Sequence, residues 1–164
     1  MNHICYIQGY RVSIFFYDFD GIFTDNRVFV SEDGKESVIC NRSDGLAIRK
    51  IKDMKIQQVI ISTETNKVVS FRAAKLGLPV IQGISNKKEI LLEYCQKSCI
   101  NINEALYIGN DINDLEAMMV VGFPVCPEDA FPEIKNIAKL VIPVLGGHGV
   151  IRELLYYLKM EKEI

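Results

Sequence analysis

The chain has 164 residues, of which 49% are hydrophobic and 24% charged, and its formal net charge is −2. This composition is typical of a globular domain; it excludes a disordered chain and argues against a nucleic-acid-binding protein, which would carry a basic excess. The N-terminus lacks a basic region followed by a long apolar run, and no other stretch could span a bilayer, so we expect a cytoplasmic protein with no nucleic-acid or membrane partner.

Short apolar runs alternate with segments of helical composition along the chain. The expected strands are residues 12–17, 58–61, 79–81, 105–108, 123–125 and 140–142. The expected helices are residues 44–55, 66–76, 87–97, 113–121 and 149–159. This alternation predicts one α/β domain over residues 1–164, with a Rossmann-like three-layer α/β/α fold around a central parallel sheet.

The segment between the first strand and the first helix breaks the alternation. Residues 27–30 and 36–39 flank Asp33-Gly34, a strong turn signal, so we predict a small β-hairpin insertion at about residues 26–40. The insertion would project from the carboxyl edge of the sheet. An exposed apolar hairpin either covers a site or pairs with another subunit.

Polar side chains follow four of the predicted strands. They are Asp18 and Asp20, then Ser62, Thr63 and Glu64, then Lys87, and finally Asn110, Asp111 and Asp114. Ligands bind beyond the carboxyl ends of the strands in open parallel sheets, so we expect these residues to form one site. Two histidines and five cysteines without a CxxC pair disfavour a zinc site or a Ser/His/Asp triad. Crowded carboxylates with other oxygen ligands instead favour Mg²⁺.

This set of residues supports phosphoryl transfer. A cation, a lysine and a hydroxyl would neutralise a phosphoryl group, and a carboxylate could attack it to form an aspartyl-phosphate. Because residues i and i+2 of an extended segment point the same way, Asp20 can act as acid and base beside Asp18. The alternative interpretation for Asn110, Asp111 and Asp114 is capping of the helix that starts near them.

Four short stretches resemble the motifs of the haloacid dehalogenase (HAD) superfamily: DFDGIFTD, IIST, QGISNK and YIGNDINDLEAM. Over nearly its full length the chain is similar to the small-cap (C0) 3-deoxy-D-manno-octulosonate 8-phosphate phosphatase family, through NRSDGLAIRKIK, AAKLGLPVIQG and GGHGVIRE. The resemblance implies a HAD-like phosphatase in which Asp18 is the nucleophile and Asp20 the general acid and base. It also implies that Ser62 binds the phosphoryl group and that Lys87 neutralises it and orients Asp18.

The resemblance implies a Mg²⁺ site that departs from the family pattern at one position. Its ligands would be the Asp18 side chain, the Asp20 backbone carbonyl and either Asn110 or Asp111, with Asp114 behind them. The common fourth motif reads GDDxxD, and the metal-binding Asp is replaced here by Asn110. This replacement, and the likeness of ISTETN to domains linked to acylneuraminate cytidylyltransferases, leave open a weakly active domain that supports such an enzyme.

The resemblance further implies a substrate and an assembly. Thr63-Glu64 replaces the Gly-Arg of the octulosonate enzymes, and a lysine at position 75 is similar to the nonulosonate 9-phosphate branch. The substrate would therefore be a 2-keto-3-deoxy sugar acid phosphate of either branch, such as a KDN or N-acylneuraminate 9-phosphate. The implied substrate-binding residues are Ser62, Thr63, Glu64, Asp44, Arg72, Lys75 and Arg152. The implied assembly is a homotetramer joined by the hairpin, in which a neighbour's tail, about residues 146–164, helps to close each site.

Overall fold

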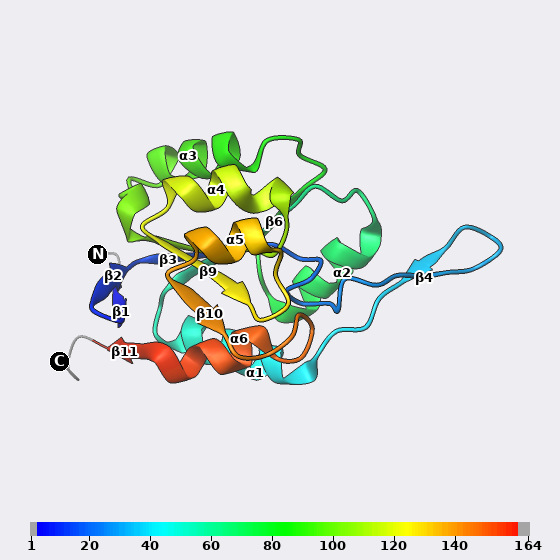
Figure 1. The fold of residues 1–164 in the computed structure, drawn as a ribbon, viewed down its shortest axis with the longest axis horizontal. Helices are drawn as coiled ribbons and strands as arrows, with labels where there is room; N and C mark the ends of the chain where they lie inside the picture. Colours follow the sequence, from blue (N-terminus) through cyan, green and yellow to red (C-terminus); the bar gives the residue numbers. More distant parts are fainter. Residues whose placement is uncertain (1–2, 161–164) are drawn as a thin grey trace.

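A six-stranded parallel sheet forms the centre of the computed structural model, which describes residues 3–160 (Figure 1). Its strand order is β10-β9-β8-β3-β6-β7. The strands are β3 (Ile14–Tyr17), β6 (Gln57–Ser62), β7 (Val80–Gln82), β8 (Ala105–Ile108), β9 (Phe123–Pro127) and β10 (Leu140–Ile142). β3 lies between β6 and β8, and all four of its residues are buried. It is continuously apolar because helices cover both faces of a parallel sheet.

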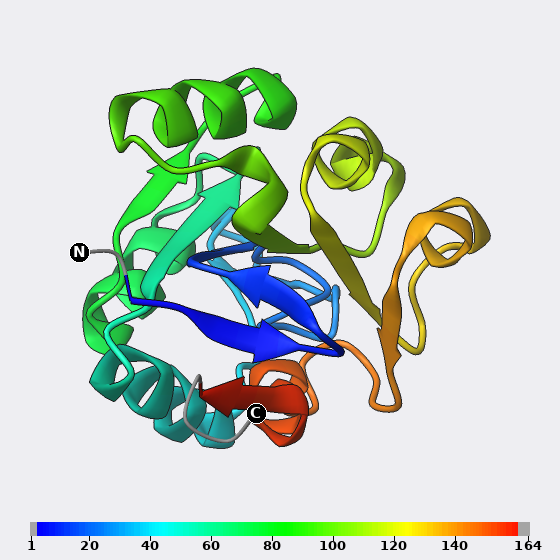
Figure 2. The same cartoon turned by 90° about the vertical axis from the view of Figure 1, so that its left-hand side faces the viewer.

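Helices form a layer on each face of the sheet (Figure 2). The first layer contains α1 (Arg42–Asp53), α2 (Lys67–Leu76) and α6 (Val150–Leu154). The second contains α3 (Lys87–Lys97), α4 (Leu115–Val120) and α5 (Pro132–Ile137). Phe15 and Tyr17 pack with the first layer and Phe16 with the second, as the two-residue period of a strand requires. The predicted three-layer α/β/α fold is therefore confirmed.

A second, three-stranded antiparallel sheet joins segments from near both ends of the described chain (Figure 2). β1 (Cys5–Ile7) pairs with β2 (Tyr10–Val12) on one side and with β11 (Leu158–Met160) on the other. The predicted strand at 12–17 is consequently divided at Ser13, which belongs to neither β2 nor β3. The predicted helix at 149–159 is wrong in its second half, because α6 ends at Leu154 and a 3₁₀ turn leads into β11.

The predicted hairpin is present and projects from the body of the molecule (Figure 1). β4 (Phe29–Val30) pairs antiparallel with β5 (Glu36–Ser37) in a sheet of its own. Val28, Phe29 and Ile39 are 51%, 73% and 74% exposed, so the hairpin leaves apolar surface uncovered in one chain. Its pairing with other subunits stays a prediction.

All five cysteines are free. No helix within residues 3–160 has the length and apolar character needed to cross a membrane. The last part of the predicted tail, residues 161–164, lies outside the described residues.

Candidate active site

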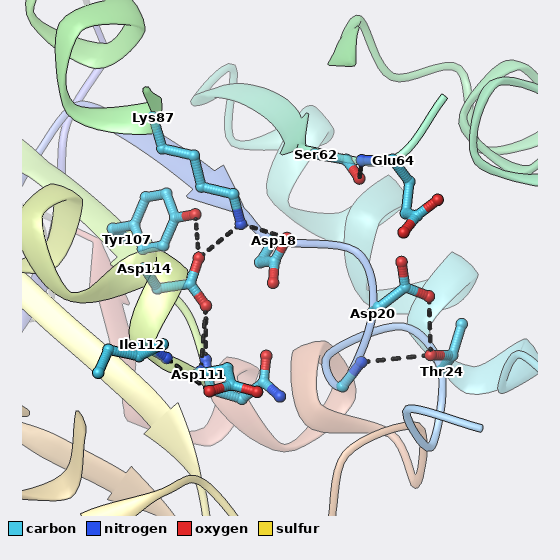
Figure 3. Close-up of polar contacts among 12 residues, drawn as sticks. Asp18, Asp20, Thr24, Ser62, Glu64, Lys87, Tyr107, Asp111, Ile112 and Asp114 are labelled. Carbon is cyan, nitrogen blue, oxygen red and sulfur yellow. Dashed lines mark hydrogen bonds and ion pairs between the residues drawn. The ribbon is translucent and has the colours of Figure 1, made fainter. Parts of the chain in front are cut away.

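The carboxyl ends of β3, β6 and β8 surround a cleft of about 250 Å³. Seven of the predicted site residues line it: Asp18, Asp20, Ser62, Thr63, Glu64, Asn110 and Asp111. Asn26, Ile112 and Asn113 line it as well, and sequence reasoning did not single them out. Lys87 and Asp114 lie directly behind the cleft (Figure 3). The structure thus brings together residues that are up to about a hundred positions apart.

Lys87 links two buried carboxylates beneath the cleft. Its Nζ lies 2.7 Å from Asp18 Oδ1 and 2.7 Å from Asp114 Oδ1, and its side chain is only 1% exposed. Burial opposes the charge on Lys87, but Asp18 and Asp114 outweigh it and raise the pKa of Lys87 above its usual value. Burial, and then the charge of Asp114, raise the pKa of Asp18, while Lys87 acts in the opposite direction. Lys87 therefore carries the positive charge on which an ionised Asp18 depends.

Asp114 is a structural support and does not line the cleft. Its Oδ1 accepts a hydrogen bond from the Tyr107 hydroxyl at 2.7 Å as well as from Lys87. Its Oδ2 accepts from the backbone N–H groups of Asn110 and Asp111 at 2.9 and 3.3 Å. Asp114 thus fixes both Lys87 and the loop after β8. Tyr107 was missed by sequence reasoning, because nothing in a buried strand marks one tyrosine as a hydrogen-bond donor.

The two candidate metal ligands after β8 differ in how their oxygens are used. Asp111 Oδ1 accepts from the Ile112 N–H at 2.6 Å and caps a short 3₁₀ helix, as the capping alternative predicted. Asn110 Oδ1 is buried and has no hydrogen-bond partner among the described residues. A buried oxygen without a partner is costly, so it marks a place for a ligand. The Asn110 oxygen is therefore the better candidate to bind a cation.

A cation in this cleft would be bound by both charged and neutral oxygen donors. Residues 3–160 contain no cluster of three or more His, Cys, Asp and Glu side chains with metal-binding geometry. The donors on offer are the Asp18 carboxylate, the Asn110 amide oxygen and backbone carbonyls of the loop after β3. Such a neutral-plus-anionic oxygen set suits a hard divalent cation. Gly21 lets the Asn110 side chain approach the loop after β3, because a Cβ on this residue would lie 2.1 Å from Asn110 Nδ2, and its φ is +80°.

Thr24 organises the loop that carries Asp20. Its Oγ1 accepts from the N–H groups of Gly21 and Asn26 at 3.2 and 3.1 Å, and its hydroxyl donates to Asp20 Oδ1 at 3.4 Å. Thr24 is fully buried, and its place in DFDGIFTD was the signal that could have identified it. Burial and the nearby Glu64 raise the pKa of Asp20, which suits a carboxyl group that must donate a proton. Asp25 instead forms an ion pair with Arg27 at the surface.

A turn near the C-terminal end supports the same loop from behind. Gly147 N–H donates to the Ile22 carbonyl at 3.0 Å, and a Cβ on Gly146 would lie 2.2 Å from the Gly21 carbonyl oxygen. This close approach explains the paired glycines of GGHG. The turn therefore helps to hold the Asp18–Asp20 loop of its own chain.

Four predicted substrate-binding residues lie outside the cleft of their own chain. Asp44 is fully buried and accepts from the N–H groups of Ile151 and Arg152, each at 3.0 Å, so it anchors α6 to α1. Arg72 donates to the Asn41 carbonyl at 2.9 Å and, with Lys75, lines a separate groove of about 540 Å³ between α1 and α2. Arg152 lies against the ring of Tyr156. Their roles in substrate binding stay predictions.

Comparisons with known proteins agree with the fold. A family model described as haloacid dehalogenase-like hydrolase matches residues 1–154. The 3-deoxy-D-manno-octulosonate 8-phosphate phosphatase of Escherichia coli is 31% identical over 144 residues, which are 87% of this chain and 77% of the relative.

Two solved structures show the same likeness. A HAD family hydrolase from Streptomyces avermitilis has a TM-score of 0.87 and 40% identity, covering 89% of this chain and 84% of the other. The 3-deoxy-D-manno-octulosonate 8-phosphate phosphatase of Moraxella catarrhalis, solved with a magnesium ion, a phosphate ion and KDO, has a TM-score of 0.84 and 28% identity. That match covers 87% of this chain and 83% of the Moraxella chain.

Proposed function

Because the chain belongs to the haloacid dehalogenase-like hydrolase family and is a phosphatase, a phosphoric monoester hydrolase, we propose that it is a Mg²⁺-dependent enzyme for 2-keto-3-deoxy sugar acid phosphates. The observation that carries the proposal is the buried Asp18–Lys87–Asp114 network beneath a polar cleft. A buried ion network of this kind is costly to maintain for stability alone. It is well suited to hold one carboxylate as a nucleophile.

Asp18 is the nucleophile in this proposal. Lys87 fixes its Oδ1 at 2.7 Å, and the other carboxylate oxygen attacks the phosphorus to form an aspartyl-phosphate. Asp20, whose pKa is raised by burial and Glu64, gives its proton to the leaving sugar oxygen. It then takes a proton from the water that hydrolyses the aspartyl-phosphate. Ser62 Oγ accepts from the Glu64 N–H at 3.1 Å, so its own hydrogen is available to a phosphoryl oxygen.

Three oxygen donors of this chain would hold Mg²⁺: the Asp18 carboxylate, the Asp20 backbone carbonyl and Asn110 Oδ1. The fit is supported by the buried Asn110 oxygen that has no partner among the described residues. When bound, the ion supplies positive charge for the phosphoryl oxygens. Asn110 gives the site one negative charge fewer than an aspartate would, and we therefore propose weaker Mg²⁺ binding than in relatives with the common motif.

The sugar acid lies at the rim formed by Thr63 and Glu64. Both residues line the cleft, and a carboxylate such as Glu64 favours hydroxyl or amide donors of a substrate. The octulosonate 8-phosphate of the named relatives and a nonulosonate 9-phosphate are both substrates of this class. The replacement of Gly-Arg by Thr63-Glu64 at the rim favours the nonulosonate.

The groove between α1 and α2 offers a site for the substrate carboxylate in an assembly. Its cationic side chains, Arg42, Arg49, Lys52, Arg72 and Lys75, form no ion pair within residues 3–160. In one chain they do not reach the cleft. In the proposed homotetramer, Arg72 and Lys75 of one copy, with Arg152 of the tail, would meet the substrate held by another.

A substrate panel tests the proposal. Phosphate release from octulosonate 8-phosphate and nonulosonate 9-phosphates should require Mg²⁺ and disappear in EDTA. Asp18→Asn should abolish it, whereas Asp25→Asn, a change of an outlying carboxylate in the same loop, should keep it. Turnover by Asp18→Asn would refute the mechanism. Negligible turnover of every sugar acid phosphate by the wild type, together with stable binding to a cytidylyltransferase, would instead favour the alternative of a weakly active domain that assists such an enzyme.

A further inference from the structure

Contacts at its base and farther out tie the hairpin insertion to the body, and one of them reaches the loop between β6 and α2 at the cleft rim. At its base, Thr24 and Cys40 form an isolated β-bridge, and Arg72 donates to the Asn41 carbonyl. Farther out, Asn66 Nδ2 donates to Glu36 Oε2 at 2.8 Å, across 30 positions of sequence. Figure 1 shows the hairpin leaving the body beside α2, the helix that Asn66 precedes. The Asn66–Glu36 contact therefore helps to set the direction in which the hairpin projects.

The Asn66 side chain uses both ends of its amide. Oδ1 accepts from the Val68 N–H at 3.1 Å and caps α2, which leaves Nδ2 to face Glu36. Capping thus fixes the orientation of the amide, and a fixed donor holds its partner better than a mobile one. The pair is partly buried, where a hydrogen bond to a carboxylate is stronger than in open solvent.

The same segment carries the substrate-facing side chains. Residues 63–66 connect β6 to α2 and include Thr63 and Glu64 of the cleft rim. Its other side is held by the end of β7, since Gly83 N–H donates to the Glu64 carbonyl at 3.0 Å and Gln82 Nε2 donates to the Asn66 carbonyl at 3.3 Å. A shift of the hairpin would therefore be resisted by a loop that is anchored on two sides.

We propose that Asn66 and Glu36 are positioning residues that latch the hairpin to the rim loop and thereby shape the entrance for the sugar part of the substrate. The proposal rests on the proposed function for its kinetic consequence, while the latch itself is a property of the free protein. Neither residue lines the cleft, whereas the proposed phosphoryl-binding residue Ser62 does, from the end of β6.

Asn66→Ser separates the latch from the helix cap. Serine keeps an N-cap oxygen for α2 but has no amide to reach Glu36. Hydrogen exchange of residues 28–39 should become faster in this variant without any substrate present. With a sugar acid phosphate, KM should rise roughly three- to tenfold and kcat should change little. Turnover of p-nitrophenyl phosphate, which lacks the sugar acid, should remain as in the wild type.

Four further variants keep the test decisive. Glu36→Gln retains an acceptor oxygen for Asn66 and should keep hairpin exchange close to that of the wild type, whereas Glu36→Ala should match Asn66→Ser in hairpin exchange, and the double change should add nothing to it. Asn101→Ser removes a comparable cap amide far from the hairpin and controls for a general loss of stability. Unchanged hairpin exchange in Asn66→Ser would overturn the latch. Faster exchange with unchanged KM would overturn its role in substrate positioning, and exchange still reports on the latch if no sugar acid phosphate is turned over.

Discussion

Replacing Asp44 with Asn reveals what the burial of this carboxylate costs the fold. Its two hydrogen bonds from α6 and the nearby Arg72 favour the ionised form, but burial outweighs them and raises the pKa of Asp44 from 3.8 to about 6. Folding therefore favours the protonated form: the stabilising contribution is fully present below about pH 3.8 and is lost as the pH rises through about 6. The full difference between the unfolded pKa of 3.8 and the folded pKa of about 6 corresponds to about 3 kcal/mol of unfolding free energy. Roughly half of it is already lost at pH 5.

Asparagine keeps the oxygen that accepts from Ile151 and Arg152 but cannot ionise. The unfolding free energy of Asp44→Asn minus that of the wild type should therefore increase by about 1.4 kcal/mol between pH 5 and pH 8. Urea unfolding followed by circular dichroism at several pH values measures this difference. Asp53→Asn, at an exposed carboxylate of the same helix, is the matched control and should show no such trend. A difference that is constant, or that falls as the pH rises, would refute the reasoning.

Three further changes probe the cleft. Lys87→Met should abolish phosphatase activity and lower the unfolding free energy by about 3–5 kcal/mol in thermal or urea unfolding, because Asp18 and Asp114 lose the ammonium group that they share. A variant as stable as the wild type would show that the two carboxylates do not depend on Lys87. Gly21→Ala should raise the Mg²⁺ concentration needed for activity and lower the unfolding free energy by about 1–3 kcal/mol, because the new Cβ would clash with the Asn110 amide at a positive φ. An unchanged Mg²⁺ dependence would argue against that clash. Asn110→Asp should lower the Mg²⁺ concentration for half-maximal activity, by about tenfold, and a rise would place the metal elsewhere.

The parts of the fold that local pattern determines were predicted well. Residues 105–108 and 87–97 form β8 and α3 with the predicted bounds, since each apolar run or helix is bracketed by polar and turn-forming residues. The second half of the helix predicted at 149–159 was wrong because β11 exists through its pairing with β1. That partner is about 150 residues away, and no local periodicity encodes it.

In the candidate site, too, some residues follow from local pattern and others depend on three-dimensional arrangement. Asp18, Ser62 and Lys87 converge because each follows a parallel strand, and strand ends of one sheet must meet. Lys75 does not join them because α2 begins at the cleft and runs away from it. At 1.5 Å per residue, Lys75 lies about 12 Å beyond Lys67 along the helix. Thr24 was missed although it stands in DFDGIFTD, because its hydrogen bonds to Gly21 and Asn26 depend on the path of the loop.

The pairing of β1 with β11 has a consequence for biosynthesis. β1 and β2 leave the ribosome before β11, the strand that completes their sheet, which follows only after roughly 150 further residues. At typical rates of translation this interval is on the order of 10–30 seconds. During that time the free edge of β1 has no native partner and is open to chaperones or to wrong pairing. The small sheet therefore makes the nascent chain vulnerable until β11 arrives to close it.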